Sequence, residues 1–202
     1  MTDRPLVTLA LDIAKLRTGW AVGSPGMARP FWGTWSMPQP WDRHEAERLD
    51  QFYQFLCEKI DEHKVTYIAM ERLLIDMADF NYNGTVPMAQ MHGTALLAAR
   101  HKGCRQGAVA IASWRSHFLG QAAAPKHLGK AQRTNWLKDE AMRKARERNW
   151  YCTVHDEAEA LGIMDFALFC LDEDYRHKIG PFTRRAELKA DIAKFRGEAP
   201  AA

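Results

Sequence analysis

One acidic residue inside an apolar strand constrains the fold of this chain more than any other feature. The stretch LVTLALDIAKLRTGWAVG, residues 6–23, reads as two strands joined by a turn through residues 15–18, which is typical of a β-hairpin. Because side chains alternate along a strand, Asp12 shares a face with Ala10, while Leu11 lies on the other. An ionised carboxylate on a half-buried strand is costly unless a cation, a donor or water meets it. The fold must therefore bring a partner to Asp12.

Hydrophobic periodicity along the rest of the chain predicts further strands and helices in alternation. Strands are expected at 28–38, 65–72 and 107–113, and helices at 41–63, 86–103, 134–149 and 155–171. A chain of 202 residues without internal repeats suits one domain. The order predicts an α/β layered fold with a mixed five-stranded sheet flanked by helices.

Positive charge is concentrated in two segments, although the formal net charge is only +3. Residues 126–148 hold eight Lys or Arg against three acids, and residues 176–196 hold seven against two. Local positive fields of this kind suit a polyanion, whereas a basic solvated helix face is the commoner explanation. Both interpretations stay open from charge alone.

The cysteines and the apolar segments indicate a cytoplasmic protein. Cys57, Cys104, Cys152 and Cys170 are scattered without the spacing of a metal site, which favours reduced thiols. No apolar run is long enough to span a bilayer, and the N-terminal residues lack the stretch typical of a signal peptide. No membrane association is expected.

Carboxylates stand at apolar elements in three separated places. Asp12 lies in the first strand, Glu71 ends the fourth, and Asp156 and Glu159 open the last helix. At about 100° per residue, Asp156 falls near the centre of that helix's buried arc and Glu159 at its edge. Asp165 falls roughly 180° from Asp156, so it is expected to face solvent.

Each acid also has a purely structural explanation. Taken alone, Asp156 and Glu159 are better explained as a helix N-terminal cap, and Glu71 could pair with Arg72. If the first and fourth strands are neighbours and the last helix crosses them, however, the acids meet. Carboxylates held together repel one another, and an oxygen-rich site of this kind selects Mg²⁺ or Mn²⁺.

Four motifs resemble, in order and spacing, those of the RuvC-type Holliday junction resolvases of the RNase H superfamily. They are LALDIAKLRTGWAVG, YIAMERLL, AQMHG and HDEAEALGIMDFAL, and they span about Leu6 to Leu171. The resemblance implies an RNase H-like nuclease domain over residues 1–175, followed by a basic C-terminal extension, 176–202. It implies a homodimeric, Mg²⁺-dependent endodeoxyribonuclease with two ions per active site, Mn²⁺ being possible. Its substrate would be branched DNA, a four-way junction resolved by paired nicking in recombination and repair.

Residue by residue, the resemblance implies catalytic and metal-binding roles for Asp12, Glu71, Asp156 and Glu159. The family usually has Asp at the last of these positions, so Glu159 is a departure, and His155 is the alternative ligand. Lys130 corresponds to a basic residue important for catalysis.

The predicted DNA-binding residues come partly from the resemblance and partly from the basic and aromatic stretches. They are Leu74, Phe80, Tyr82, Arg115, Lys126, Lys130, Arg133 and Lys138, together with the basic cluster 143–148. Leu74 stands where some relatives place an aromatic wedge, so Phe80 or Tyr82 would supply the stacking surface.

Three other classes share part of this pattern. The first hairpin also resembles the YqgF-type RNase H-like proteins linked to ribosomal RNA maturation, but those lack an acid comparable to Glu71. Sugar kinases and actins begin with Asp on a hairpin, but no second Gly-rich phosphate turn is present. A nucleic-acid-binding module with the same fold and no turnover is the non-enzymatic alternative.

Overall fold

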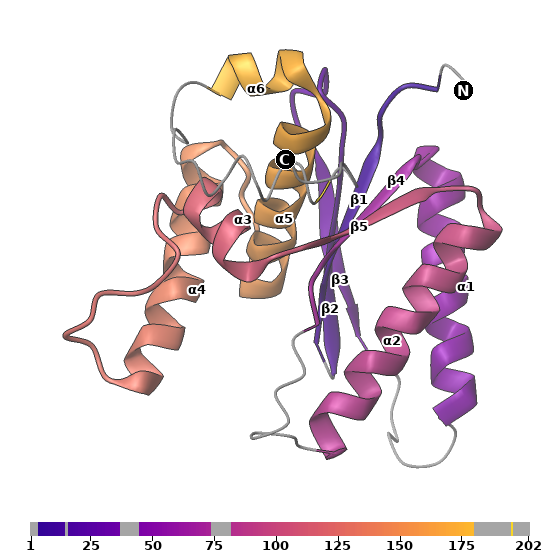
Figure 1. The fold of residues 1–202 in the computed structure, drawn as a ribbon, viewed down its shortest axis with the longest axis horizontal. Coiled ribbons are helices and arrows are strands. Elements are labelled where there is room, and N and C mark those ends of the chain that lie inside the picture. The colour runs from indigo at the N-terminus through magenta and orange to yellow at the C-terminus, as the bar shows by residue number, and fades with distance from the viewer. Residues whose placement is uncertain (1–3, 15, 37–44, 74–81, 180–194, 196–202) are drawn as a thin grey trace, which may run out of the picture.

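The computed structural model describes residues 4–14, 16–36, 45–73, 82–179 and 195. The strands are β1 (Thr8–Ile13), β2 (Arg17–Gly23), β3 (Phe31–Ser36), β4 (Tyr67–Glu71) and β5 (Arg105–Val109). The helices are α1 (Glu45–His63), α2 (Tyr82–His101), α3 (Ile111–Phe118), α4 (Lys130–Glu147), α5 (His155–Leu171) and α6 (Glu173–Ile179). The predicted α/β layered fold with a mixed five-stranded sheet is confirmed (Figure 1).

The sheet has the strand order β3-β2-β1-β4-β5. The first three strands in sequence pair antiparallel, and β1, β4 and β5 run parallel. As the central strand, β1 is covered on both faces, and Leu9, Ala10 and Leu11 are fully buried. This explains why its sequence is nearly continuous in apolar residues.

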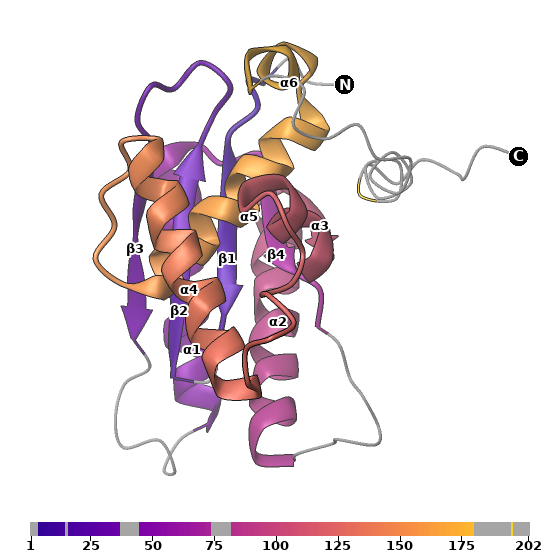
Figure 2. The same cartoon turned by 90° about the vertical axis from the view of Figure 1, so that its left-hand side faces the viewer.

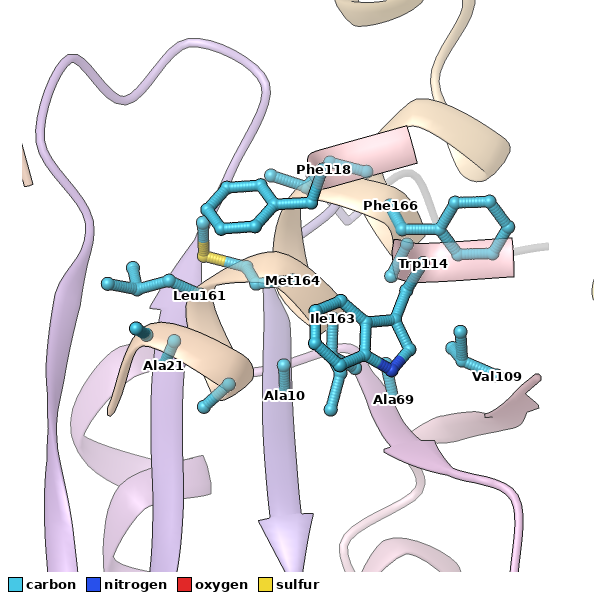
Figure 3. Close-up of a cluster of buried hydrophobic side chains, with 14 of the residues drawn as sticks. Ala10, Ala21, Ala69, Val109, Trp114, Phe118, Leu161, Ile163, Met164 and Phe166 are labelled. Carbon is cyan, nitrogen blue, oxygen red and sulfur yellow. The ribbon is translucent and has the colours of Figure 1, made fainter. Parts of the chain in front are cut away.

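Helices cover the two faces of the sheet differently. The Leu9 and Leu11 face packs against α1 and α2, whereas Ala10, with neighbouring alanines of β2 and β4, packs against α5 (Figures 1 and 3). The small side chains on this second face let α5 lie close to the strands. In the turned view, α3 and α4 lie over the outer side of α5 (Figure 2).

The prediction that Asp165 faces solvent is wrong. Asp165 is 1% exposed, and its carboxylate accepts hydrogen bonds from His117 (3.0 Å), Arg148 (3.3 Å) and Tyr175 (2.5 Å). The error came from treating α5 as a helix with one buried face. Residues 156–170 of α5 are all buried, because the sheet covers one side and the outer helices cover the other. A helix that is apolar nearly all round is a buried helix.

We expect Asp165→Asn to destabilise the protein by about 2 kcal/mol, a fall in melting temperature of roughly 6 °C, because the half-buried Arg148 then loses its counter-charge and the buried hydrogen bonds to Asp165 are weakened. Burial opposes ionisation of Asp165, but the hydrogen bond and charge of His117, with Arg148, outweigh it and hold the pKa below its usual value. Thermal unfolding measures the effect. Asp61→Asn, which breaks an exposed ion pair with Lys102, is the matched control and should change little. Equal melting temperatures for both variants would contradict the assignment.

Several element boundaries also differ from the predictions, and α2 begins at Tyr82, four residues earlier than expected. The fifth strand ends at Val109, and the expected strand residues Ile111–Ser113 begin α3 instead. The apolar alternation of 107–113 resembles a strand, but Trp114 and Phe118 continue it at helical spacing and pack on α5. The basic helix begins at Lys130, four residues earlier than expected, where Gln132 accepts a hydrogen bond from the Gly129 amide.

Two predicted DNA-binding residues, Leu74 and Phe80, lie outside the described residues. All four cysteines are free thiols. Among the helices in the described part of the chain, none is both long and apolar enough to cross a membrane.

Candidate functional site

Asp12 and Glu71 lie side by side at the ends of two parallel strands. The last residues paired between β1 and β4 are Leu11 and Met70, and the two acids come next on their strands. Both acids follow two residues after paired alanines, Ala10 and Ala69, that face α5. Because side chains alternate along a strand, both carboxylates are directed to the α5 side of the sheet.

Gly19 brings the N-terminal end of α5 onto this part of the sheet. It is paired with Asp12 across the hairpin. An ideal Cβ on Gly19 would lie 1.9 Å from the backbone carbonyl oxygen of Asp156. The first turn of α5 therefore rests directly on β2, and Asp156 stands beside Asp12.

The three acids Asp12, Asp156 and Glu159 form what we call the acidic cluster. One carboxylate oxygen from each lies within 4.8 Å of the other two. Glu71 borders the cluster: its Oε2 accepts a hydrogen bond from Trp114 Nε1 at 2.8 Å, and its charge acts on Asp12 and Glu159. The structure thus brings together acids that are up to 147 residues apart in sequence.

The electrostatics of the cluster disfavour ionised acids. Burial, and then the charges of Glu159, Glu71 and Asp156, raise the pKa of Asp12 well above its usual value. Burial likewise raises the pKa of Glu159, against the opposing charge of Arg115, and raises that of Glu71, against its hydrogen bond from Trp114. An added cation would stabilise all of these carboxylates in the ionised form.

The helix cap is made by a different acid from the pair proposed above. Glu157 Oε2 accepts hydrogen bonds from the backbone amides of Thr153 (2.8 Å) and Val154 (3.4 Å). Asp156 and Glu159 are thus not needed to cap α5, and their carboxylates lie close to that of Asp12 instead. The capping explanation for that pair is therefore wrong.

Cations meet the cluster from three elements. Arg17, at the start of β2, pairs with Asp156, and Arg115 Nη2 of α3 lies 3.6 Å from Glu159 Oε1. The charge of Lys138, on α4, acts on Asp12 and Glu159. Lys138 is half-buried and precedes two residues of α4, Met142 and Ala145, that are buried at helical spacing.

Sequence reasoning missed two residues that contact these acids. Arg17 lies in a quoted motif, and its position two residues before Gly19 puts it on the same strand face, a signal that could have been read. Trp114 carried no such signal, because its role depends on α3, which was not predicted.

Several predicted DNA-binding residues are exposed or contact a loop rather than the acids. Lys130 and Lys126 are exposed, as is Tyr82 at the start of α2. Arg133 donates to the carbonyls of Lys126 (2.6 Å) and Leu128 (2.7 Å), and so braces the loop before α4.

Other contacts engage His155 and three cations of the 143–148 stretch, Arg143, Lys144 and Arg148. His155 Nε2 lies 3.4 Å from Asp139 of α4 and is not among the acids and histidines grouped with Asp12 in the described chain. Arg143 pairs with Glu140 and Glu147 on the same helix. Cations that are already paired in this way are less available to DNA.

The donor atoms of the acidic cluster fit a hard divalent cation. They are all carboxylate oxygens, close enough to share one ion, and they include no thiolate or imidazole. Such a set suits Mg²⁺ or Mn²⁺ rather than zinc. The arrangement can therefore hold a dication next to basic side chains, which is a combination suited to a phosphate group.

Comparison with protein-family models and with curated proteins finds no match. Solved structures do match. RuvC of Thermus thermophilus superposes with a TM-score of 0.60 at 16% identity, covering 81% of this chain and 94% of that one. The same protein in complex with a Holliday junction substrate gives 0.63 at 16% identity, covering 81% and 93%. The yeast mitochondrial Holliday junction resolvase Ydc2 gives 0.51 at 13% identity, covering 85% and 81%. The chain therefore has the fold of these proteins.

Proposed function

We propose that this chain is a divalent-metal-dependent, structure-specific endonuclease that resolves four-way DNA junctions by paired nicking. The observation that carries the proposal is the acidic cluster: Asp12, Asp156 and Glu159 present carboxylate oxygens within 4.8 Å of one another. It lies on a fold shared with a RuvC solved on a Holliday junction. The free state of all four cysteines supports work in the reducing cytoplasm.

Each acid has a proposed part in the reaction. Two Mg²⁺ ions, or Mn²⁺, would supply an activated water and stabilise the departing 3′ oxygen when bound. Asp12, Asp156 and Glu159 would hold the ions, and Glu71, whose carboxylate accepts a hydrogen bond from the Trp114 indole, would be a further ligand. Fixing these groups before the substrate arrives lowers the cost of reorganisation during the reaction.

Basic side chains of α3 and α4 give the DNA a path to the cluster. Arg115 and Lys138 are the predicted DNA-binding residues nearest to the acids, and we propose that they contact the phosphate to be cut. Lys130, Lys126 and Arg133 lie farther along, at the exposed start of α4 and the loop before it, where they would position the adjoining backbone. Such contacts position DNA without reading sequence.

A homodimer would match the two-fold symmetry of a four-way junction and deliver paired cuts. One face of α2 supports it: Leu96 and Leu97 are 41% and 49% exposed, and open space surrounds Gly93 one turn before them. Two adjacent, exposed leucines next to an uncovered glycine form an apolar patch, which is typical of an interaction surface.

We expect Leu97→Glu to weaken the dimer by about tenfold to a hundredfold, because a charge would be buried in the interface. Sedimentation velocity over a range of concentrations measures the dissociation constant. Tyr151→Glu changes another exposed large side chain, away from α2, and should leave the dimer intact. A monomeric wild-type protein at all concentrations would contradict the dimer but not the nuclease.

The function is tested by incubating the purified protein with a labelled four-way junction, with and without Mg²⁺. Cutting that requires the ion and releases paired nicks supports the proposal. Tight junction binding without cutting in either Mg²⁺ or Mn²⁺ would favour the non-catalytic module instead. A structured RNA tested in parallel, if it were cut faster than the junction, would favour the RNA-directed alternative.

A further inference from the structure

The ion pair between Arg17 and Asp156 lies at the rim of the acidic cluster. Arg17 lies at the exposed end of the first hairpin, and its side chain is 45% exposed, whereas that of Asp156 is 12% exposed. It is on the same face of β2 as Gly19, so its side chain is directed to the α5 side, where the acidic cluster lies. An ion pair whose cation is this exposed contributes only modestly to stability.

We infer that Arg17 is a displaceable cation that holds the place of a divalent ion at Asp156, and that it binds a DNA phosphate once the ion has displaced it. The inference rests on the proposed nuclease function and adds to it a residue with two alternating partners. Both partners are anions whose paired oxygens suit the planar guanidinium fork.

The charges around Asp156 explain why a cation is needed there before metal binds. Asp156, Asp12 and Glu159 present their oxygens within 4.8 Å of one another, so their negative charges repel. Arg17 relieves part of this repulsion at Asp156, as Arg115 does at Glu159. A divalent ion shared by all three carboxylates relieves more of it, and so can displace a half-exposed side chain.

The position of Arg17 explains its second partner. When the guanidinium leaves Asp156, its backbone remains fixed in β2, so the side chain stays within reach of the cluster's rim. A phosphate that lies against the bound ions would be the nearest anion. Arg17 would then bind the DNA strand only when metal is present. The positioning of DNA is in this way coupled to metal binding.

Metal binding without DNA tests the first half of the inference. Titration calorimetry with Mn²⁺ compares the full-length wild type with Arg17→Met and Arg17→Lys. We expect Arg17→Met to bind Mn²⁺ about fivefold more tightly, the worth of one partly exposed ion pair, and Arg17→Lys to stay near wild type. Arg29→Met, which removes another exposed arginine, is the matched control and should bind as wild type. An unchanged or weaker Mn²⁺ affinity for Arg17→Met would overturn the inference.

Junction cutting as a function of Mn²⁺ concentration tests the second half. For Arg17→Met we expect the half-saturating Mn²⁺ concentration to fall, while the maximal cutting rate also falls, by about tenfold. An unchanged maximal rate would overturn the phosphate contact. If the wild type itself neither binds Mn²⁺ nor cuts, the nuclease proposal fails. If it does both and Arg17→Met behaves identically, only the role of Arg17 fails.

Discussion

Asp12→Asn is expected to reduce junction cutting by about 1,000-fold or more, a change of about 4 kcal/mol in barrier height, while junction binding is retained. Asn keeps the volume of the side chain and removes its charge. Asp12 is the member of the acidic cluster on the central strand, where it adjoins both Glu71 and the α5 acids. The Asn substitution therefore removes the central one of the carboxylates proposed to bind the metal. Because it also removes a negative charge near the phosphate, the affinity for DNA should stay equal or rise.

Two measurements separate this effect from a loss of folding. Cutting is followed on a labelled junction at saturating Mg²⁺, and binding is followed on the same junction without the ion. Asp50→Asn, at an exposed acid of α1, is the matched control and should cut as wild type. Retention of more than a tenth of the wild-type rate by Asp12→Asn would contradict a central role for Asp12.

The same variant should be more stable than wild type when metal is absent. Burial and the neighbouring acids raise the pKa of Asp12 above its value in the unfolded chain. The ionised form is therefore disfavoured by folding, so at neutral pH this carboxylate costs stability that an amide does not. Thermal unfolding in a chelator should show the higher melting temperature for Asp12→Asn. Added Mg²⁺ should stabilise the wild type more than the variant, because only the wild type keeps the full ligand set.

The stability of the metal-free protein should also depend on pH, for the same electrostatic reason. The pKa values of Asp12, Glu71 and Glu159 are all raised by folding, so protonation favours the folded state. Stability of the metal-free protein should rise as the pH falls from neutral toward these raised pKa values. Asp165 acts oppositely: its pKa is lowered, so its contribution is lost as the pH falls below the unfolded value of 3.8. Melting temperatures across this range that do not vary would contradict the cluster's electrostatics.

The positions of Asp12 and Glu71 could be predicted from the sequence, because a strand pattern indicates on which face of the sheet a residue lies and where the strand ends. The position of Asp12 follows from alternation along β1, and that of Glu71 from the end of β4, so their meeting needed only the parallel pairing of those strands. The cations were harder. Lys130 matched a family position but is exposed, whereas Lys138 acts on the acids because α4 packs its buried face toward α5. That packing is a tertiary fact with no local pattern.

The failures concern residues whose environment is set from outside their own element. Asp165 was assigned to solvent from the phase of one helix, but α3 and α6 bring His117 and Tyr175 to it. Trp114 donates to Glu71 because α3 replaces the second half of an expected strand. Hydrophobic periodicity identifies the solvent-facing side of a helix only when one side of the helix is clearly polar. Helix α5 has no polar side, so its periodicity could not show that all of its sides are buried.

Gly19→Ala is expected to disrupt the site through backbone contact alone. The added Cβ would lie 1.9 Å from the carbonyl oxygen of Asp156 and 2.4 Å from its carbonyl carbon. Both are backbone atoms, so no side-chain rotation relieves the overlap, and β2 and α5 must separate by roughly 1.5 Å to restore an ordinary contact. Such overpacking costs about 1–3 kcal/mol in stability.

Separation of β2 from α5 moves Asp156 away from Asp12, so cutting should fall by about 100-fold, the effect of a displacement of this size on reacting groups. Gly26→Ala is the matched control, since nothing lies within 4 Å of the Cβ it would add. Cutting rates are compared at a temperature where both variants are folded, as judged by circular dichroism, and Mn²⁺ affinity is measured alongside. A folded Gly19→Ala variant should lose cutting and bind Mn²⁺ more weakly, because the ligands are carried by two elements that no longer meet. If it instead cut and bound Mn²⁺ as the control does, the contact between Gly19 and α5 would not be what assembles the acidic cluster.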